Sequence, residues 1–244
     1  MASVADAIRP PSITTRDMVW TIPADCYPQP MNTFDEAYRT AGAYFGELPE
    51  AVLFKHLGML DPGLPVLDIG SGQGRNARFL ARHGFTIDAL DPSDVTVEQL
   101  TRSVTEDGLS IRPIRGTFQD LTPADETYGT VLVFGLIPLL DRAEIDALAA
   151  MVTSALCGGG LLFVTAFGTW DPAYPRHASE WAAVGANSFR GPEGNLRTYL
   201  EPGELTRLFP GLDEIHTWEG LGPEHQHGSG PAERHGMAEA VWRR

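Results

Sequence analysis

The chain has 244 residues, of which 43% are hydrophobic, and a formal net charge of −14. This length can bury a substantial core in one large domain, whereas the acidic balance lacks the basic surface that binds nucleic acid or anionic lipid. No apolar run reaches the roughly 20 residues that span a bilayer, and two cysteines are too few for a disulfide framework. We therefore expect a cytoplasmic protein with neither nucleic acid nor a membrane as its partner.

The N-terminal region is predicted to be an extended arm over residues 1–30, because it is rich in Pro, Ser and Thr and shows little periodicity. The remainder, residues 31–244, is predicted to be a single domain. Its first part, residues 31–60, has a helical pattern and is expected to form a cover. Residues 168–198 hold aromatic residues and turn formers without a clear period, which indicates a variable insertion or lid.

Strand-like and helix-like segments alternate after residue 60. The expected strands are 66–69, 86–90, 111–115, 130–134, 161–167, 214–218 and 237–242, and the expected helices are 75–83, 94–106, 142–156 and 202–209. Strands that alternate with helices of this length predict an α/β fold. We expect a doubly wound, mostly parallel seven-stranded sheet with helices on both faces.

Three alternating glycines, Gly70, Gly72 and Gly74, follow the first of these strands, at the edge where open α/β sheets bind ligands. The dinucleotide fingerprint G-x-G-x-x-G fails here, because residue 75 is Arg. Asp68 precedes the loop, and Asp91 ends the next strand, 21 residues after Gly70. The Asp68 carboxylate suits a ligand with an ammonium group better than one with a diphosphate. Asp91 can accept hydrogen bonds from ribose hydroxyls. The pattern favours S-adenosylmethionine over a nicotinamide dinucleotide.

The stretch VLDIGSGQGRNARFLARHGFTIDALDPS, residues 66–93, resembles the cofactor half of class I S-adenosylmethionine-dependent methyltransferases. It is most similar to the tellurite-resistance methyltransferase branch, where G-R-N, L-A-x-x-G-[FY] and D-A-x-D recur together. The resemblance implies a Rossmann-like methyltransferase fold, S-adenosyl-L-methionine as cofactor and S-adenosyl-L-homocysteine as product. The expected cofactor-binding residues are Asp68, Gly70, Ser71, Gly72, Gly74, Asn76, Asp91, Pro92, Thr117, Phe118 and Phe134. Thr117 departs from the branch, which usually has an acid there, so the partner of the adenine amine stays open.

The substrate side is expected at the residues that follow the fourth strand. Leu136 and Ile137 lie there in the sequence, and Tyr38 and Tyr44 from the helical cover are further candidates, with core packing as the alternative for the two tyrosines. Methyl transfer from a sulfonium needs mainly alignment and exclusion of water, so no catalytic triad is expected.

The histidine-rich stretch between the last two strands holds the candidate catalytic residues. The resemblance matches His225 to a histidine of a G-E-L-H-R stretch and Arg234 to a later arginine, and His227 is a candidate for substrate contact. Gln226 stands where the branch has an arginine, which favours a small or drug-like nucleophile over a doubly charged oxyanion. Three histidines, His225, His227 and His235, could also bind a metal, with His225-x-His227 as a possible strand pair, but no Cys or well-spaced third ligand is obvious, so no metal is expected.

These observations predict methyl transfer from S-adenosylmethionine to a small-molecule nucleophile (thiol, hydroxyl, amine or chalcogen oxyanion) by in-line displacement. The alternative is a non-catalytic S-adenosylmethionine-binding protein that acts as a regulator or assembly subunit. The methylated atom, the need for a general base and the oligomeric state stay open.

Overall fold

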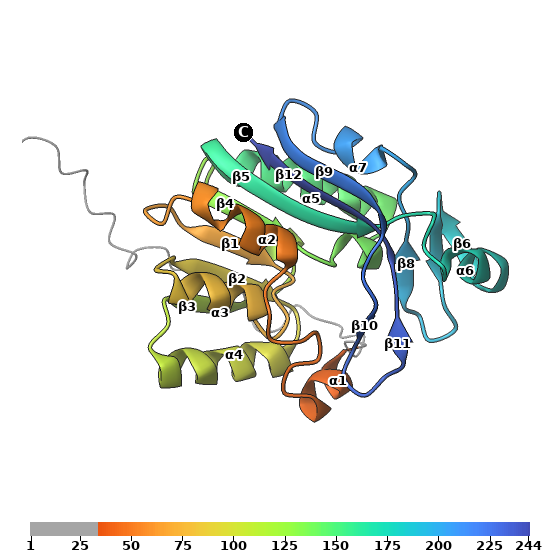
Figure 1. Ribbon diagram of the computed structural model, residues 1–244, viewed down its shortest axis with the longest axis horizontal. Helices are drawn as coiled ribbons and strands as arrows, with labels where there is room; N and C mark the ends of the chain where they lie inside the picture. Colours follow the sequence, from red (N-terminus) through yellow and green to blue (C-terminus); the bar gives the residue numbers. More distant parts are fainter. Residues whose placement is uncertain (1–33) are drawn as a thin grey trace, which may run out of the picture. The chain divides into compact units, whose positions relative to one another are not determined.

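A computed structural model describes residues 34–244, so the predicted arm over residues 1–30 lies outside the described residues. Its main feature is a seven-stranded sheet in the order β3-β2-β1-β4-β5-β12-β9 (Figure 1). The strands are β1 (Val66–Ile69), β2 (Ile87–Asp91), β3 (Ile111–Arg115), β4 (Tyr128–Val133), β5 (Leu156–Phe167), β9 (Asp213–Leu221) and β12 (Gly236–Arg243). The first five are parallel, and β12 runs antiparallel to both β5 and β9. The predicted fold class is confirmed.

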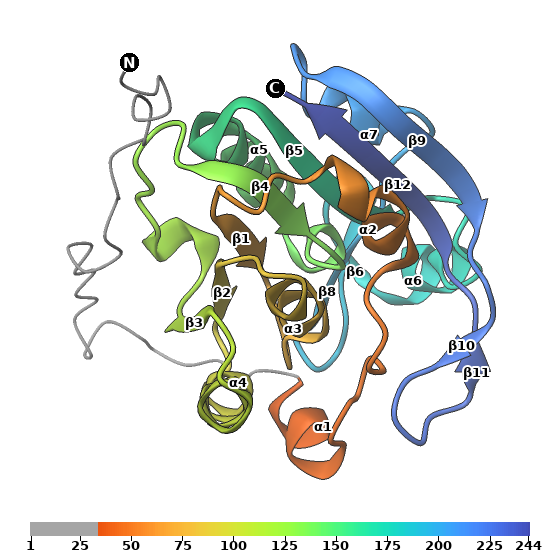
Figure 2. The ribbon, with the colours of Figure 1, turned by 60° about the vertical axis from the view of Figure 1, so that its left-hand side comes forward.

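Helices cover both faces of the sheet, as Figures 1 and 2 show. They are α2 (Ala51–His56), α3 (Arg75–Arg82), α4 (Asp94–Asp107), α5 (Arg142–Ala155) and the short α7 (Glu204–Arg207). One core packs α5 and α7 against Leu67, Ile69 and Val131. The other packs α2, α3 and α4 against Val66 and Leu132. Successive strand residues point to opposite faces, so a sheet buried on both sides needs the nearly continuous apolar strands seen in the sequence.

Helix α5 begins where the sequence predicts. The N–H of Glu144 donates to the Asp141 side chain at 2.9 Å, and the N–H of Asp141 donates to the Glu144 carboxylate at 2.8 Å. This capping box satisfies two N–H groups that a helix start would otherwise leave unpaired. Strand β5 starts directly after the helix and is longer than predicted. Its early residues include three glycines, and its pairing with β4 shifts register there, which masks the strand signal.

Three short helical segments lie within the predicted cover. Helix α1 (Asp35–Thr40) is only six residues long, because Ala41 is extended, with φ −118° and ψ 121°. The chain then turns over residues 41–45 before α2 and the 3-10 turn η1 (Leu57–Met59). Two further 3-10 turns, η2 (Phe118–Asp120) and η3 (Ile137–Leu139), follow β3 and β4. No helix of residues 34–244 is long and apolar enough to cross a membrane.

Residues 168–198 form a small unit of their own. It comprises helix α6 (Tyr174–Glu180) and an antiparallel sheet of β6 (Ala182–Gly185), β7 (Ser188–Arg190) and β8 (Leu196–Thr198). A bridge between Gly168 and Leu200 joins it to the carboxyl end of β5. A second hairpin, β10 (His225–Gln226) and β11 (Ala232–Glu233), lies between β9 and β12. In Figures 1 and 2, both units lie toward the carboxyl ends of the parallel strands.

Candidate functional site

The glycine loop connects β1 to α3 at the carboxyl edge of the sheet. The N–H groups of Gly70 and Ser71 donate to the Leu90 carbonyl at 2.8 and 2.9 Å, which ties the loop to the end of β2. Gly74 has φ +76°, and a Cβ there would lie 2.6 Å from Leu100 Cδ1, so this position needs glycine for packing. A Cβ on Gly72 would meet only the Tyr38 hydroxyl, at 3.5 Å. The loop therefore combines a packed end with a backbone that a ligand can approach.

Asp91 ends β2 beneath this loop and is only 6% exposed. Its Oδ2 accepts the Gly72 N–H at 2.8 Å, and its Oδ1 accepts from the Ser93 N–H and the Thr96 hydroxyl, both at 2.9 Å. Burial raises the pKa of Asp91, and these three donors act against that shift. The carboxylate is thus held rigidly, and Oδ2 keeps a lone pair for one further donor.

Asp68 lies in β1, two residues before the loop, and is 2% exposed. Among residues 34–244 its Oδ2 has no hydrogen-bond partner. Burial raises its pKa to about 7, although the charge of Arg75 acts in the opposite direction. An unpaired buried carboxylate oxygen costs free energy, and a cationic donor would satisfy it. The residues present therefore fit an ammonium group next to the loop.

Residues 35–45 cover the loop through side-chain hydrogen bonds. Gln73, the residue between the second and third glycines, accepts the Tyr44 N–H at 2.7 Å and donates to the Ala41 carbonyl at 2.8 Å. Ser93 donates to Asp35 at 2.5 Å, and Gln99 donates to the Tyr38 carbonyl at 2.9 Å. Position 73 is a variable position of the alternating-glycine pattern, so the sequence does not indicate that Gln73 contacts the cover.

Tyr38 belongs to this cover and is 6% exposed, and its hydroxyl would lie 3.5 Å from a Cβ on Gly72 of the loop. Burial, together with the charge of Asp91, raises its pKa, so its phenol is protonated. Leu136 also reaches the loop, because a Cβ on Gly70 would lie 3.7 Å from its side chain. Ile137, predicted beside it, is instead 1% exposed and belongs to the core.

Several predicted cofactor residues have partners within the protein. Asn76 accepts the Glu50 N–H at 2.9 Å and so anchors the start of α2. The Thr117 hydroxyl donates to Asp120 at 2.7 Å in a capping box of η2. Phe118 is buried in the core, and Phe134 packs against Phe163 with ring centroids 6.4 Å apart. Among the other predicted cofactor residues, Ser71 is half-buried in the loop, and Pro92 is exposed after β2.

The β10–β11 hairpin carries the predicted catalytic residues and reaches the cover. The ring of His227 stacks on Tyr44 with centroids 5.7 Å apart, and the Gly228 N–H donates to the Tyr44 carbonyl at 3.1 Å. His225 Nε2 lies 3.2 Å from His227 Nε2. Arg234 is exposed, and its Nε donates to the Gly222 carbonyl at 3.1 Å. The structure thus brings the two histidines together and leaves Arg234 on the other face of the hairpin.

Two residues that face the hairpin are absent from the sequence-based prediction. Arg197, in β8, has its pKa lowered by burial, while the charges of Tyr199, Glu233 and Asp171 act against that shift. No carboxylate within residues 34–244 lies within ion-pair distance of Arg197. Asp171 is 2% exposed and accepts from His235 Nδ1 at 3.1 Å and the Gly236 N–H at 2.9 Å. Both residues lie in the segment without a periodic pattern.

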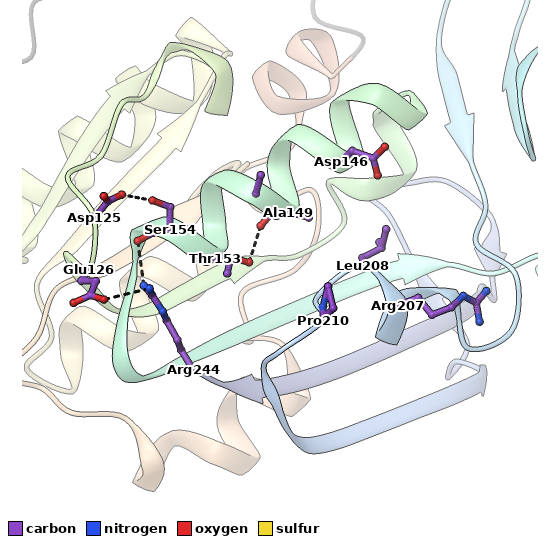
Figure 3. Close-up of a pocket in the computed structure, with 11 residues that line it drawn as sticks. Asp125, Glu126, Asp146, Ala149, Thr153, Ser154, Arg207, Leu208, Pro210 and Arg244 are labelled. Atoms are coloured by element: carbon purple, nitrogen blue, oxygen red, sulfur yellow. Dashed lines mark hydrogen bonds and ion pairs between the residues drawn. The ribbon is translucent and has the colours of Figure 1, made fainter.

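A hollow among the described residues lies elsewhere. Figure 3 shows its lining, which includes Glu126 and Ser154 together with the C-terminal Arg244. It measures about 670 Å³ and lies where β4 begins and α5 ends. That is the amino edge of the parallel strands, opposite the glycine loop, so we do not assign it to the candidate site.

Comparisons with known proteins agree with this geometry. Residues 66–160 match the family described as "Methyltransferase domain". A ubiquinone biosynthesis O-methyltransferase of Methylocella silvestris is 31% identical over 157 residues, which are 62% of this chain and 58% of that protein. The chain therefore spans just over half the length of this relative.

Two solved structures share the fold. TehB from Haemophilus influenzae has a TM-score of 0.64 at 16% identity, covering 86% of this chain and 65% of that one. The 1,6-didemethyltoxoflavin-N1-methyltransferase of Burkholderia thailandensis, solved with bound S-adenosylhomocysteine, has a TM-score of 0.59 at 17% identity, covering 86% and 79%. The family match begins at the first residue of β1 and includes both the glycine loop and Asp91. Residues 66–160 therefore match a methyltransferase domain, on a fold that the chain shares with a solved methyltransferase.

Proposed function

We propose that the protein transfers a methyl group from S-adenosylmethionine to a small-molecule nucleophile. The observation that carries the proposal is the buried, unpaired Oδ2 of Asp68 directly before the alternating glycines. The bound cofactor supplies an electrophilic methyl group on a sulfonium that is its own leaving group, so the protein must mainly align the reactants and exclude water.

In this proposal the cofactor lies across the carboxyl ends of β1 and β2. Asp68 accepts from the methionine ammonium, and the free lone pair of Asp91 Oδ2 accepts from a ribose hydroxyl. The backbone of Gly70 and Gly72 makes the close approach. Asn76, Thr117 and Phe118 then act indirectly, because their side chains already hold α2, η2 and the core.

The substrate side is assigned to Leu136, Tyr38 and Tyr44, with the β10–β11 hairpin beyond them. Three features favour a small molecule. The net charge of −14 repels nucleic acid, and the similar proteins named above include a ubiquinone biosynthesis O-methyltransferase and a 1,6-didemethyltoxoflavin-N1-methyltransferase. Arg197 also offers a half-buried positive charge, which the charge of Glu233 on the hairpin stabilises and which suits an acceptor with an anionic group. Arg234, exposed on the outer face, is assigned no substrate contact here.

The test uses methyl-labelled S-adenosylmethionine and a panel of thiols, phenols, amines, selenite and tellurite. We expect label in one acceptor class, and calorimetry should detect binding of both the cofactor and S-adenosylhomocysteine. Asp68→Asn should weaken cofactor binding, whereas His216→Gln, in the edge strand β9, should not. Absence of cofactor binding would overturn the proposal. Binding without turnover of any acceptor would favour the non-catalytic regulator or assembly subunit instead.

A further inference from the structure

Four ionisable side chains converge on one face of the β10–β11 hairpin. His225 lies opposite Glu233 in the antiparallel pair. Because side chains alternate along a strand, His227 and His235 belong to the same face. All four are half-buried, whereas the residues that separate them along each strand are exposed. We call His225, His227, Glu233 and His235 the hairpin cluster.

The distances within the hairpin cluster suit a single small cation. His225 Nε2 and His227 Nε2 are 3.2 Å apart, and Glu233 Oε1 lies 3.4 Å from His227 Nε2 and 3.8 Å from His235 Nε2. One ligand atom from each residue lies within 4.8 Å of all the others. A tetrahedral ion bound at about 2.0 Å holds its ligand atoms roughly 3.3 Å apart. Two of these separations, 3.2 and 3.4 Å, are therefore already close to the tetrahedral value, and the third is longer.

Two of the histidines are oriented for ligation by partners on their other nitrogen. His235 Nδ1 lies 3.1 Å from Asp171 Oδ2, and His225 Nδ1 lies 3.1 Å from the Pro223 carbonyl. A carbonyl and a carboxylate accept hydrogen bonds, so each Nδ1 carries the proton and each Nε2 presents a lone pair. Asp171 is itself fixed by the N–H groups of Ala173 and Gly236. Metal-ligating histidines have this kind of outer support.

We propose that the hairpin cluster binds one divalent transition-metal ion of the zinc class. Three imidazoles and one carboxylate suit Zn²⁺ and its neighbours Co²⁺ and Ni²⁺, whereas Mg²⁺ and Ca²⁺ take mainly oxygen ligands. Four protein ligands complete a tetrahedral sphere, which is typical of a structural site. The ion would clamp the two strands of the hairpin and hold His227 against Tyr44 of the cover.

This site changes the role predicted for His225. A histidine bound to a metal through Nε2, with its Nδ1 proton on a carbonyl, has no lone pair left to accept a proton from a substrate. The proposed metal site involves no residue of the glycine loop. The proposal therefore does not depend on whether the protein transfers methyl groups.

The experiment uses the full chain without an affinity tag, stripped with EDTA and dialysed against Zn²⁺, with bound metal measured by mass spectrometry. We expect one equivalent of zinc, and a Co²⁺ titration should give the visible absorption of a tetrahedral site. At 100 times its Kd, Zn²⁺ should raise Tm by roughly 5 °C, and Mg²⁺ should leave Tm unchanged. Failure to bind zinc would overturn the proposal, because the cluster would then be only a hydrogen-bonded group.

Two ligand variants and one matched control sharpen the result. His225→Gln and Glu233→Gln should each weaken zinc binding by roughly 100-fold. The control is His216→Gln, since His216 also pairs with a glutamate, Glu239, at 2.8 Å, but lies on β9 away from the hairpin. Wild-type zinc affinity in Glu233→Gln, or an equal loss in His216→Gln, would contradict the assignment. Unchanged circular dichroism in all three variants excludes a folding defect as the cause.

Discussion

The glycine loop and the β10–β11 hairpin lie at the same end of the sheet but are built in different ways. Backbone groups shape the loop: two N–H groups donate to Leu90, and a third donates to Asp91. Side chains shape the hairpin, whose four proposed ligand atoms come from two short strands and two adjoining residues, His227 and His235. A loop made by the backbone demands glycines and an acid at fixed spacing, so its sequence is constrained. A cluster made by side chains depends on how β10 pairs with β11, and this register cannot be read from the sequence.

The largest effect on the free energy of unfolding is expected from a substitution at Gly74, where the glycine loop packs against Leu100. Gly74→Ala should lower the free energy of unfolding by about 3 kcal/mol, because left-handed backbone strain adds to the overlap with Leu100. Gly84→Ala is the control, since Gly84 has φ +88° but nothing within 4 Å of an added Cβ. It should lose only about 1 kcal/mol. Urea unfolding measures both, and equal losses would show that packing against Leu100 does not matter.

Asp68→Asn tests the unpaired carboxylate and should have the next largest effect. Cofactor affinity should fall by about 10- to 100-fold, because an ammonium loses its charged acceptor. The variant should be at least as stable as the wild type at pH 8, since burial penalises the charged form of Asp68 and this penalty is removed. Calorimetry and urea unfolding measure the two effects, and a parallel loss of stability and binding would indicate a structural role.

The same residue gives a pH dependence with a definite sign. Burial raises the pKa of Asp68 to about 7 in the folded protein, from 3.8 for an unburied carboxyl. The folded state therefore binds the extra proton between these values, and the contribution of Asp68 to the free energy of unfolding falls as pH rises from about 4 to 7. Asp68→Asn should lack this contribution. Identical pH profiles for the variant and the wild type would contradict the assigned pKa shift.

Much of this architecture could be predicted because long elements carry repeated signals. The seven strands of the sheet and the Asp141–Glu144 capping box follow from apolar runs and cap residues. Strands β6, β7 and β8 have only three or four residues, too few for an alternating pattern to be distinguished from a loop. Arg197 and Asp171 lie in that region, and their roles depend on contacts with a hairpin far along the chain. The His225-x-His227 pair was visible, whereas Glu233 and His235 join it only through the register of β11.

The smallest effect on the free energy of unfolding is expected at Gln73, which connects the glycine loop to the β10–β11 hairpin through Tyr44. Its side chain accepts the Tyr44 N–H, and Tyr44 in turn stacks on His227 of the hairpin. Gln73→Ala should lower the free energy of unfolding by about 1 kcal/mol or less, because residues 41–45 can open locally and hydrate the freed groups. Amide hydrogen exchange at Tyr44 should accelerate by roughly 10-fold, while amides of β4 keep their protection.

The control for Gln73→Ala is Gln119→Ala, because Gln119 is exposed and makes one surface hydrogen bond, to Glu144, at 3.3 Å. That variant should leave the exchange of Tyr44 unchanged. If Gln73→Ala also leaves it unchanged, the cover is held by its aromatic packing rather than by the loop. The loop and the hairpin would then be independent regions, and metal at the hairpin could not affect the glycine loop through Tyr44. Faster exchange that zinc reverses would instead show that the two regions are coupled through this residue.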